Sequence, residues 1–365
     1  MSNQPPIEVP QGAIRLNTDS QKLEFFAQDR WYEFATYEEA TGLGGRGFRC
    51  AGVGSGGNNT IETFNIATQG NSIDVGFDLH QSTTQSGGGS SRTRAVLGGG
   101  YTGGGVGQTY IQYFEMNSLT NSIDFGDLTV QMGRNGGASN NTRALFMGQI
   151  SNSGNVINFV TIASTGDALD FGDMTMNYEG PQALSNRTRL VFGGGTGPSP
   201  YPNLNNMDYV TIASTGNGVD FGDLVVAAYA KMAFSNSTRG IYLGGNTGGA
   251  NTNTIEFINI ASTGNAQDFG DISGRPSQMG GTVSNATRGV FYGGYFVGSP
   301  NSNNSMEFIT ITSKGNSMSF GDLASEGGNG IIGVCDSHGG VCQWQYLKSI
   351  QSLELALKAQ YLKET

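Results

Sequence analysis

The sequence has few of the residue types on which metal proteins and many enzymes depend. Among its 365 residues are 2 His and 3 Cys. Two histidines come close to excluding a His-based metal cluster, and three cysteines in a chain of this length do not form a disulfide framework. Lys and Arg total 19 against 29 Asp and Glu, which gives a net charge of −10. A nucleic-acid partner is therefore excluded, because it requires a basic surface.

Long hydrophobic segments are also missing. No apolar run approaches the roughly 20 residues that a membrane-spanning helix needs. The N-terminus has no basic segment followed by an apolar one. We therefore expect a protein without a secretory signal and without membrane insertion.

Proline is scarce and glycine is abundant, with 9 and 59 residues respectively. Glycine at this frequency, without the period of collagen, indicates either disorder or many tight turns. Aromatic residues make up 10% of the chain, and their rings have to be buried somewhere. We therefore favour a folded protein with dense turns.

The tripeptide Phe-Gly-Asp recurs along the chain. Its Asp is at Asp127, Asp173, Asp223, Asp271 and Asp322, with spacings of 46, 50, 48 and 51 residues. A degenerate earlier copy ends at Asp78. A second marker, Thr-Arg, ends at Arg94, Arg143, Arg189, Arg239 and Arg288, and Arg49 begins the same pattern without its Thr. The two markers define six repeat units.

Each repeat unit contains four short segments typical of β-strands. An apolar run follows the Arg and ends in glycines, an alternating strand such as 254–260 comes after a variable loop, and the Phe-Gly-Asp segment and a weaker strand complete the unit. One unit has too few apolar residues for a core of its own. The pattern predicts an all-β fold, a six-bladed β-propeller in which each blade packs on its neighbours.

The ends of the repeat predict how the ring closes. The first unit begins at 48–53 without the strand that precedes it, and 330–335 supplies an extra strand of that type. We expect this C-terminal strand to complete the first blade. In this alignment Cys50 and Cys335 face each other at the seam as neighbouring thiols. Whether they form a disulfide depends on compartment and geometry.

The repeat units resemble kelch repeats. Each has a double glycine after an apolar strand, then a strand of the Ile-Glu-Phe-Ile-Asn-Ile type, then Ser-Thr-Gly. The Trp usual in kelch repeats is absent, and Phe takes its approximate place, which makes the chain a kelch-like variant. The sequence Ile-Ala-Ser-Thr-Gly-Asn followed by Asp-Phe-Gly-Asp-Leu resembles repeats in structural proteins of tailed phages, notably marine and cyanobacterial ones.

The N-terminal segment predicts a separate β-module. Turn residues at 17–20 and 27–30 divide it into a three-stranded meander, and the segment resembles a small module of phage fibre and other virion proteins. The module is too small to be stable alone. We expect its aromatic residues to anchor it on another chain or on the propeller: Phe25, Phe26, Trp31 and Tyr32.

Residues 342–364 predict an amphipathic helix. Trp344, Leu347, Ile350, Leu353, Leu357 and Tyr361 recur at three- and four-residue steps. The helix packs either on its own propeller or on a neighbouring virion protein. The predicted organisation is a module at 1–36, a linker at 37–46, the propeller at 47–340 and the helix at 341–365.

The repeated charged residues invite a chemical interpretation. Asp pairs such as Asp124/Asp127 and Asp170/Asp173 are able to bind calcium or to act in acid–base catalysis. A catalytic pair is normally unique, so repetition favours turn caps that accept backbone N–H groups. The Arg series shares the period of the Asp series, which predicts Arg–Asp contacts within or between blades. The alternative is an anion channel lined by Arg.

The variable loops after the double glycine predict a recognition surface, including for sugars. They carry rigid aromatic side chains among adaptable polar ones. The candidate residues are Tyr101, Tyr110, Tyr201, Tyr295 and Phe296. The other interpretation is that these residues are exposed loop without a ligand.

The phage resemblance implies a virion structural protein of the tail-fibre or adhesin kind, located at the particle surface. Its expected partners are other virion proteins and a host-surface glycan, and fibre proteins are usually homotrimers. A capsid-decorating or head-fibre protein is the second interpretation. A carbohydrate-active propeller enzyme is the third, and it needs a unique acidic or metal cluster that this sequence does not supply. We therefore expect neither enzyme activity nor a cofactor.

Overall fold

The computed structural model describes residues 10, 12–17, 22–28, 30–33, 45–52, 59–102, 106–118, 120–148, 154–274, 279–295, 304–325, 328 and 330–337. The chain divides into two compact units, Met1–Gly42 and Leu43–Thr365. The described part is all-β and contains no helix, so it contains none that is long and apolar enough to cross a membrane. The helix predicted at 341–365 lies outside the described residues.

The first unit is a three-stranded antiparallel sheet. Its strands are β1 (Ile14–Asn17), β2 (Lys22–Ala27) and β3 (Arg30–Glu33), in the order β1-β2-β3. The predicted meander is confirmed. Its four predicted aromatic residues pair across β2 and β3, Phe25 stacked on Tyr32 and Phe26 edge-on to Trp31, with ring centroids 5.5 and 5.3 Å apart. The module therefore packs its own rings together.

The described residues of the second unit form six antiparallel sheets. Sheet 1 is built from β28 (Ile332–Cys335), β4 (Arg46–Cys50), β5 (Thr60–Asn65) and β6 (Ile73–Asp78). Sheet 2 is built from β7 (Gly87–Ser90), β8 (Arg94–Gly98), β10 (Val106–Glu115) and β11 (Ile123–Met132), with β9 (Tyr101–Thr102) paired to β10. Sheet 3 is built from β12 (Gly136–Ser139), β13 (Arg143–Met147), β14 (Val156–Thr161) and β15 (Leu169–Asp173).

The remaining three sheets repeat the same order. Sheet 4 is built from β16 (Gln182–Ser185), β17 (Arg189–Gly193), β18 (Asn206–Thr211) and β19 (Val219–Asp223). Sheet 5 is built from β20 (Met232–Ser235), β21 (Arg239–Leu243), β22 (Thr254–Asn259) and β23 (Gln267–Asp271). Sheet 6 is built from β24 (Gly281–Ser284), β25 (Arg288–Tyr292), β26 (Ser305–Thr310) and β27 (Met318–Asp322).

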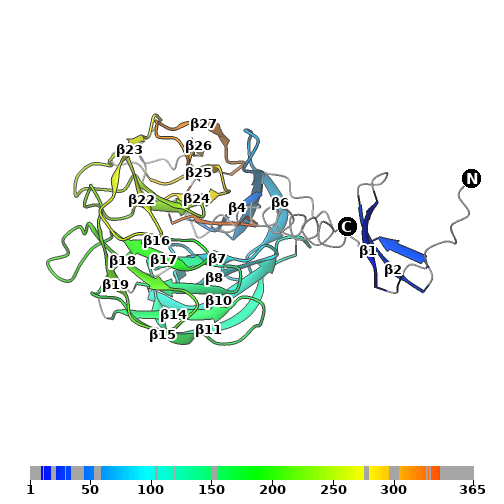
Figure 1. Cartoon of the computed structure of the whole chain (residues 1–365). Coiled ribbons are helices and arrows are strands. Elements are labelled where there is room, and N and C mark those ends of the chain that lie inside the picture. The colour runs from blue at the N-terminus through cyan, green and yellow to red at the C-terminus, as the bar shows by residue number, and fades with distance from the viewer. Residues whose placement is uncertain are drawn as a thin grey trace, which may run out of the picture. The chain divides into compact units, whose positions relative to one another are not determined.

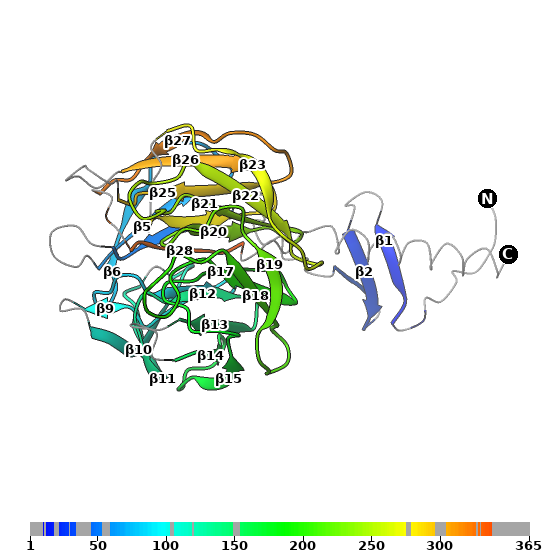
Figure 2. The same cartoon turned by 90° about the vertical axis from the view of Figure 1, so that its left-hand side faces the viewer.

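The arrangement of the six sheets is propeller-like. The first strands of the sheets, such as β7, β16 and β24 in Figure 1 and β12, β20 and β28 in Figure 2, lie nearest the middle. Fourth strands such as β15, β23 and β27 lie at the rim in both figures. The second strand of each sheet is buried on both faces, which explains its continuous apolar run after the Arg. The first strands approach closely: a Cβ added at Gly137 would lie 2.6 Å from the backbone N of Gly88.

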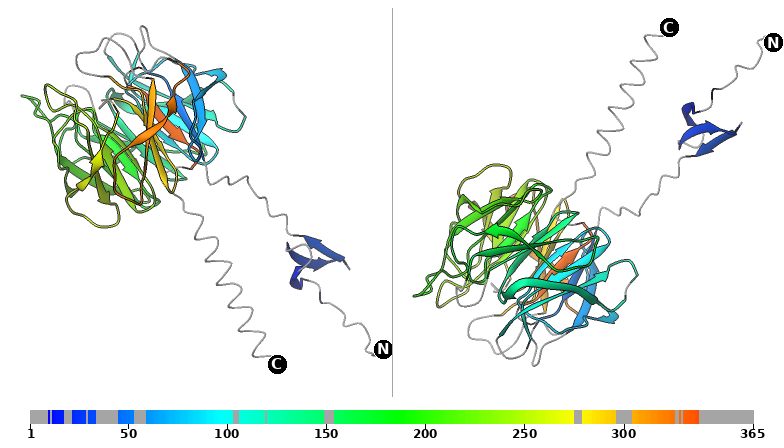
Figure 3. Two further views of the ribbon diagram at one scale, coloured as in Figure 1. Left: turned by 90° about the horizontal axis from the view of Figure 1, so that it is seen from above. Right: turned by 90° about the horizontal axis from the view of Figure 1, so that it is seen from below.

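The predicted pairing of the C-terminal strand is confirmed. β28 pairs antiparallel with β4, and Val334 lies opposite Phe48. The orange-red end of the coloured chain lies beside the blue strands of sheet 1 in both views of Figure 3. Ile332 and Val334 enter a hydrophobic cluster shared with sheet 2, whereas Cys335 enters one shared with sheet 6. β28 therefore contacts the sheets on both sides of sheet 1.

The predicted register of this pairing is wrong by three residues. Arg46, not Arg49, occupies the position of the Arg series, because Arg46 pairs with Asn65 as Arg239 pairs with Asn259. Cys50 consequently lies opposite Ile332, and Cys335 lies opposite Gly47. The two cysteines are free and point to opposite faces of sheet 1. Three residue steps correspond to roughly 10 Å along a strand, too far for a disulfide.

Arg49 is instead a fully buried cation in β4. Its side chain is 0% exposed, and Nη1 lies 3.9 Å from Oε1 of Glu62. Nε and Nη2 have no hydrogen-bond partner among the described residues. Burial also raises the pKa of the neighbouring Cys50 thiol to about 12, so this cysteine remains a protonated core residue.

Five hydroxyl groups and one thiol link the last residues of the six first strands one to the next. Ser139, Ser185, Ser235 and Ser284 each donate from Oγ to the carbonyl of the equivalent residue in the preceding sheet, over 2.6–2.8 Å. Cys335 Sγ continues the series to Ser284 O at 3.2 Å, and Ser90 Oγ donates to Cys335 O at 2.8 Å. We call these six residues the Ser/Cys ring. Because Cys335 takes the sixth position, the ring depends on β28.

Candidate functional site

A cavity of about 890 Å³ lies where the segments leading into the six first strands meet. Each sheet contributes the residue two positions before its first strand. These six equivalent residues are Gln85, Arg134, Gly180, Ala230, Met279 and Gly330. Its volume is typical of small-molecule sites. The cavity is our candidate functional site.

All six of these residues have a left-handed backbone. Their φ angles lie between 51° and 70°. Glycine adopts this conformation freely, and Gly180 and Gly330 do so here. For the four residues with a side chain the same conformation costs about 1 kcal/mol or more each. The backbone strain at these four residues therefore lowers the stability of the fold at positions where glycine would fit without strain. The four residues are Gln85, Arg134, Ala230 and Met279.

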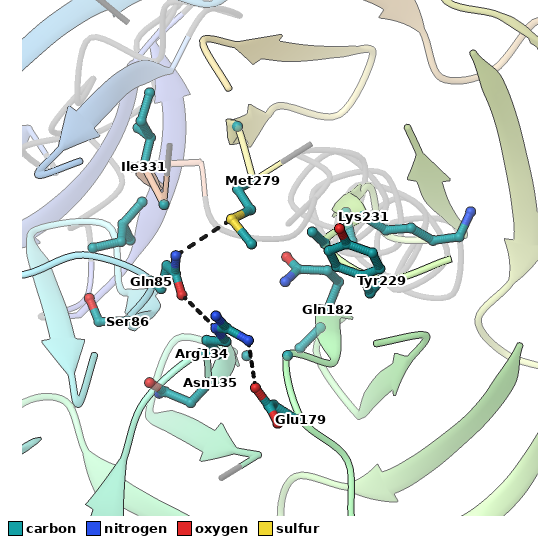
Figure 4. A pocket seen from close by; sticks show the side chains of 18 of the residues that line it. Gln85, Ser86, Arg134, Asn135, Glu179, Gln182, Tyr229, Lys231, Met279 and Ile331 are labelled. Atoms are coloured by element: carbon teal, nitrogen blue, oxygen red, sulfur yellow. Dashed lines mark hydrogen bonds and ion pairs between the residues drawn. The ribbon is translucent and has the colours of Figure 1, made fainter. Parts of the chain in front are cut away.

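Three polar side chains on one side of the cavity are connected. Arg134 Nε donates to Gln85 Oε1 at 3.2 Å, and Arg134 Nη1 contacts Glu179 Oε1 at 2.7 Å. We call this set the Gln85–Arg134–Glu179 cluster. Figure 4 shows the cluster as a row, with Met279 facing Gln85 and with Gln182 and Tyr229 opposite. The Arg134 side chain remains 49% exposed, so it is accessible from the cavity.

Only some of the predicted recognition residues line the cavity. Tyr201 and Tyr295 line the cavity, as does Tyr229, which the sequence analysis missed. Tyr101 pairs through its backbone with Thr84, the neighbour of Gln85, and burial raises the pKa of its phenol. Tyr110 lies on β10 opposite Asp127, away from the cavity lining. Phe296 lies outside the described residues.

A second set of polar residues, also missed from the sequence, is buried between the sheets. The third residue of each third strand, or its equivalent in β10, accepts a backbone N–H from the preceding sheet. The set is Glu62, Gln112, Asn158, Asp208, Glu256 and Glu307. The available signal was a polar residue at the third position of the third strand in five of the six sheets.

One of these carboxylates is paired with a buried lysine in the cavity wall. Lys231 Nζ donates to Glu256 Oε1 at 2.5 Å, and both side chains are 0% exposed. Glu256 also accepts the backbone N–H of Val225. Neither charge faces open solvent, so the pair neutralises itself inside the wall.

Asp208 gives a pH-dependent prediction. Burial raises its pKa, opposed by hydrogen bonds from Thr175. An acid whose folded-state pKa is raised loses stability as the pH rises through its titration range, above about 4. Asn158 fills the equivalent position in sheet 3 and makes the same backbone bond. The free energy of unfolding of Asp208→Asn should therefore rise relative to that of the parent protein as the pH rises from 3.5 to 7.

Urea unfolding of both proteins across this pH range measures the effect. The expected result is a difference that grows in favour of the variant as the pH rises. A difference that stays constant, or that reverses in sign, would contradict the assigned environment of Asp208.

The predicted Arg–Asp contacts within or between sheets are wrong for most of the series. Each Arg lies over an aromatic ring of its own sheet, for example Arg143 over Phe159 at 4.7 Å. Its guanidinium donates to a carbonyl of the following sheet, as Arg143 Nη1 does to Ile212 O at 2.9 Å. The other members make the same contact: Arg46, Arg94, Arg189, Arg239 and Arg288. Arg46 alone among them also contacts an Asp, Asp336, at 3.6 Å.

The Asp series caps turns and links sheets. Asp124 and Asp170 accept the N–H of Gly126 and Gly172, as the turn-cap interpretation predicted. The Asp that ends each motif is joined through its backbone N–H to a turn of the next sheet. These residues are Asp78, Asp127, Asp173, Asp223, Asp271 and Asp322. Among the described residues no group of three His, Cys, Asp or Glu is arranged to hold a metal ion.

The cavity can therefore bind a polar molecule through planar amide, guanidinium and carboxylate groups beside aromatic rings. Its described lining includes no histidine and no cysteine. No protein-family model and no curated protein matches this chain. The assignment of a function therefore depends on the geometry and on the sequence resemblance.

Proposed function

We propose that the second unit is a closed six-bladed, kelch-like β-propeller that serves as the recognition domain of a phage virion surface protein of the tail-fibre or adhesin kind. Closure is supported by the β28–β4 pairing and by the Ser/Cys ring. The virion assignment is supported by the resemblance of the repeats and of the N-terminal module to phage structural proteins.

The observation that carries the proposal is the position of the cavity relative to the chain ends of this unit. β28 begins beside the cavity, where Gly330 and Ile331 are part of the lining. It ends next to the start of β4, where Arg46 N donates to Asp336 Oδ1 at 2.7 Å. The chain therefore enters and leaves the propeller at the end of the strands away from the cavity. A domain held by its terminal segments would display the cavity outward.

The N-terminal module suits an anchoring role. Ile14 and Leu16 lie on the same face as Phe25 and Tyr32, and their side chains are 58% and 55% exposed. An exposed apolar face on so small a sheet is typical of an attachment surface. We propose that this face binds another virion protein or a second copy of the chain in a homotrimer. A contribution of the C-terminal segment to the same attachment stays a prediction.

A capsid-decorating or head-fibre protein is the second candidate, because a displayed cavity suits either location. A propeller enzyme is less favoured, since the one carboxylate among the described lining residues, Glu179, is only 11% exposed and is already paired with Arg134. Such an enzyme would require an unpaired acid at this place.

Two measurements on the full chain separate these candidates. Gold labelling of intact particles with antibodies against the chain should mark the tail. Purified full-length protein should compete with particles for adsorption to host cells. Labelling of the capsid without competition would favour the decoration protein. Absence of label from the particle would overturn the virion assignment altogether.

A further inference from the structure

Two polar side chains of the cavity, Gln85 and Arg134, occupy positions where equivalent sheets have glycine. At its six equivalent positions Gly180 and Gly330 provide the left-handed turn without strain. Gln85 and Arg134 occupy the same conformation, and both direct polar groups into the cavity. Strained residues retained at a concave site indicate a role for the side chain itself.

The Gln85–Arg134–Glu179 cluster holds its donors and acceptors in place before any ligand arrives. The bonds from Arg134 to both neighbours restrict all three side chains. Arg134 Nη2 has no hydrogen-bond partner among the described residues. Adjacent hydroxyl groups of a sugar, each of which both donates and accepts, match such an alternation of amide, guanidinium and carboxylate.

The charges of the cavity favour a neutral ligand. Arg134 is balanced by Glu179, and Lys231 is balanced by Glu256 within the wall. No uncompensated cation is therefore available in the described lining to select a carboxylated or phosphorylated sugar. The site differs in this respect from an anion site, which presents an unpaired Arg or Lys.

Aromatic rings complete the surface that a sugar would need. Tyr201, Tyr229 and Tyr295 line the cavity from the connections of sheets 4, 5 and 6, and Tyr229 lies opposite the polar cluster (Figure 4). Tyrosine offers a rigid apolar face together with a hydroxyl, a combination enriched in recognition surfaces. Tyr201 is 54% exposed and Tyr295 is 37% exposed, so their rings are accessible.

We infer that the cavity binds the end of a neutral oligosaccharide, with the Gln85–Arg134–Glu179 cluster contacting neighbouring hydroxyl groups and the three tyrosines packing on the sugar rings. The inference rests on the proposed function as a recognition domain and gives it a ligand class. It assigns binding to one end of the propeller and to named residues.

The test uses full-length protein and an array of neutral and acidic oligosaccharides, followed by calorimetry on the tightest neutral binder. Arg134→Gly and Gln85→Gly install the residue already present at two equivalent positions, so folding should be retained or improved. Each variant should lose about tenfold or more in affinity. Ala230→Gly relieves the same backbone strain without removing a polar group, and it should bind as the parent protein does.

The outcomes are distinct. Neutral binding that is lost in Arg134→Gly and kept in Ala230→Gly supports the inference. Unchanged affinity of Arg134→Gly, or binding of acidic sugars alone, overturns it. If the full chain binds no oligosaccharide but still competes for host cells, the ligand class is wrong and the proposed function stands. If it neither competes nor labels particles, the proposed function fails independently.

Discussion

Deleting residues 330–365 is expected to abolish cooperative folding of the second unit. The deletion removes β28 and with it the first strand of sheet 1. Ile331, Ile332 and Val334 would leave their hydrophobic clusters, and the Ser/Cys ring would lose Cys335. Burial of three such side chains is worth about 5–8 kcal/mol, which approaches the whole stability of a typical domain.

Circular dichroism melting and size-exclusion chromatography measure this effect. We expect the deleted protein to lose its cooperative transition and to expand or aggregate. The control is deletion of 341–365 alone, which retains β28 and should keep the transition. A protein lacking 330–365 that still melts cooperatively near the parental temperature would contradict the role of β28.

The second large effect is expected at the buried pair in the cavity wall. Glu256→Ala leaves Lys231 buried with an uncompensated charge and should cost about 3–5 kcal/mol of unfolding free energy. Lys231→Met should cost much less. In that variant the Glu256 carboxylate still accepts the Val225 N–H. Glu307 shows that a carboxylate is accommodated at the same position in sheet 6 with hydroxyl and backbone partners alone.

Urea denaturation of the two single variants and of Lys231→Met combined with Glu256→Gln decides the point. The combined variant should recover most of the stability that Glu256→Ala loses, because no charge remains buried. Equal losses of unfolding free energy for Lys231→Met and Glu256→Ala would mean that the lysine contributes net stability and would contradict the expected difference between the two variants.

The repeat pattern was sufficient to predict the strands and the partner of β28. Each unit repeats the same alternation, and only the first lacks an initial strand, so a strand at 330–335 had one evident place. The residue-level register was harder, because Arg46 and Arg49 are separated by only three residues and both precede apolar positions. The pairing of β4 with β5 identifies Arg46 as the repeat residue.

Equal periods did not predict contacts correctly. The Arg and Asp series share a period, yet the guanidinium groups reach carbonyls of the next sheet while most of the motif Asp residues bond turns through their backbone. A period fixes neither the direction of a side chain nor the end of the sheet where it lies. The Ser/Cys ring was missed for the same reason, since its members are recognisable only when the first strands are brought together.

The candidate site could be predicted only in part. Aromatic residues in the variable loops indicated Tyr201 and Tyr295, which do line the cavity. The short connecting segments that contain Gln85, Arg134 and Glu179 have no repeated sequence motif, so no pattern identified these residues. Their importance follows from backbone conformation and from the meeting of six segments, neither of which a single sequence displays.

Disulfide mapping of Ile332→Cys in a background of Cys335→Ser and Cys342→Ser shows directly whether β28 completes sheet 1 in this register. Position 332 lies directly opposite Cys50, at a separation that suits a disulfide. After folding under oxidising conditions, mass spectrometry should find a 50–332 link. Absence of that link, or a Cys50–Cys335 disulfide in the unaltered protein, would contradict the register by which β28 completes sheet 1.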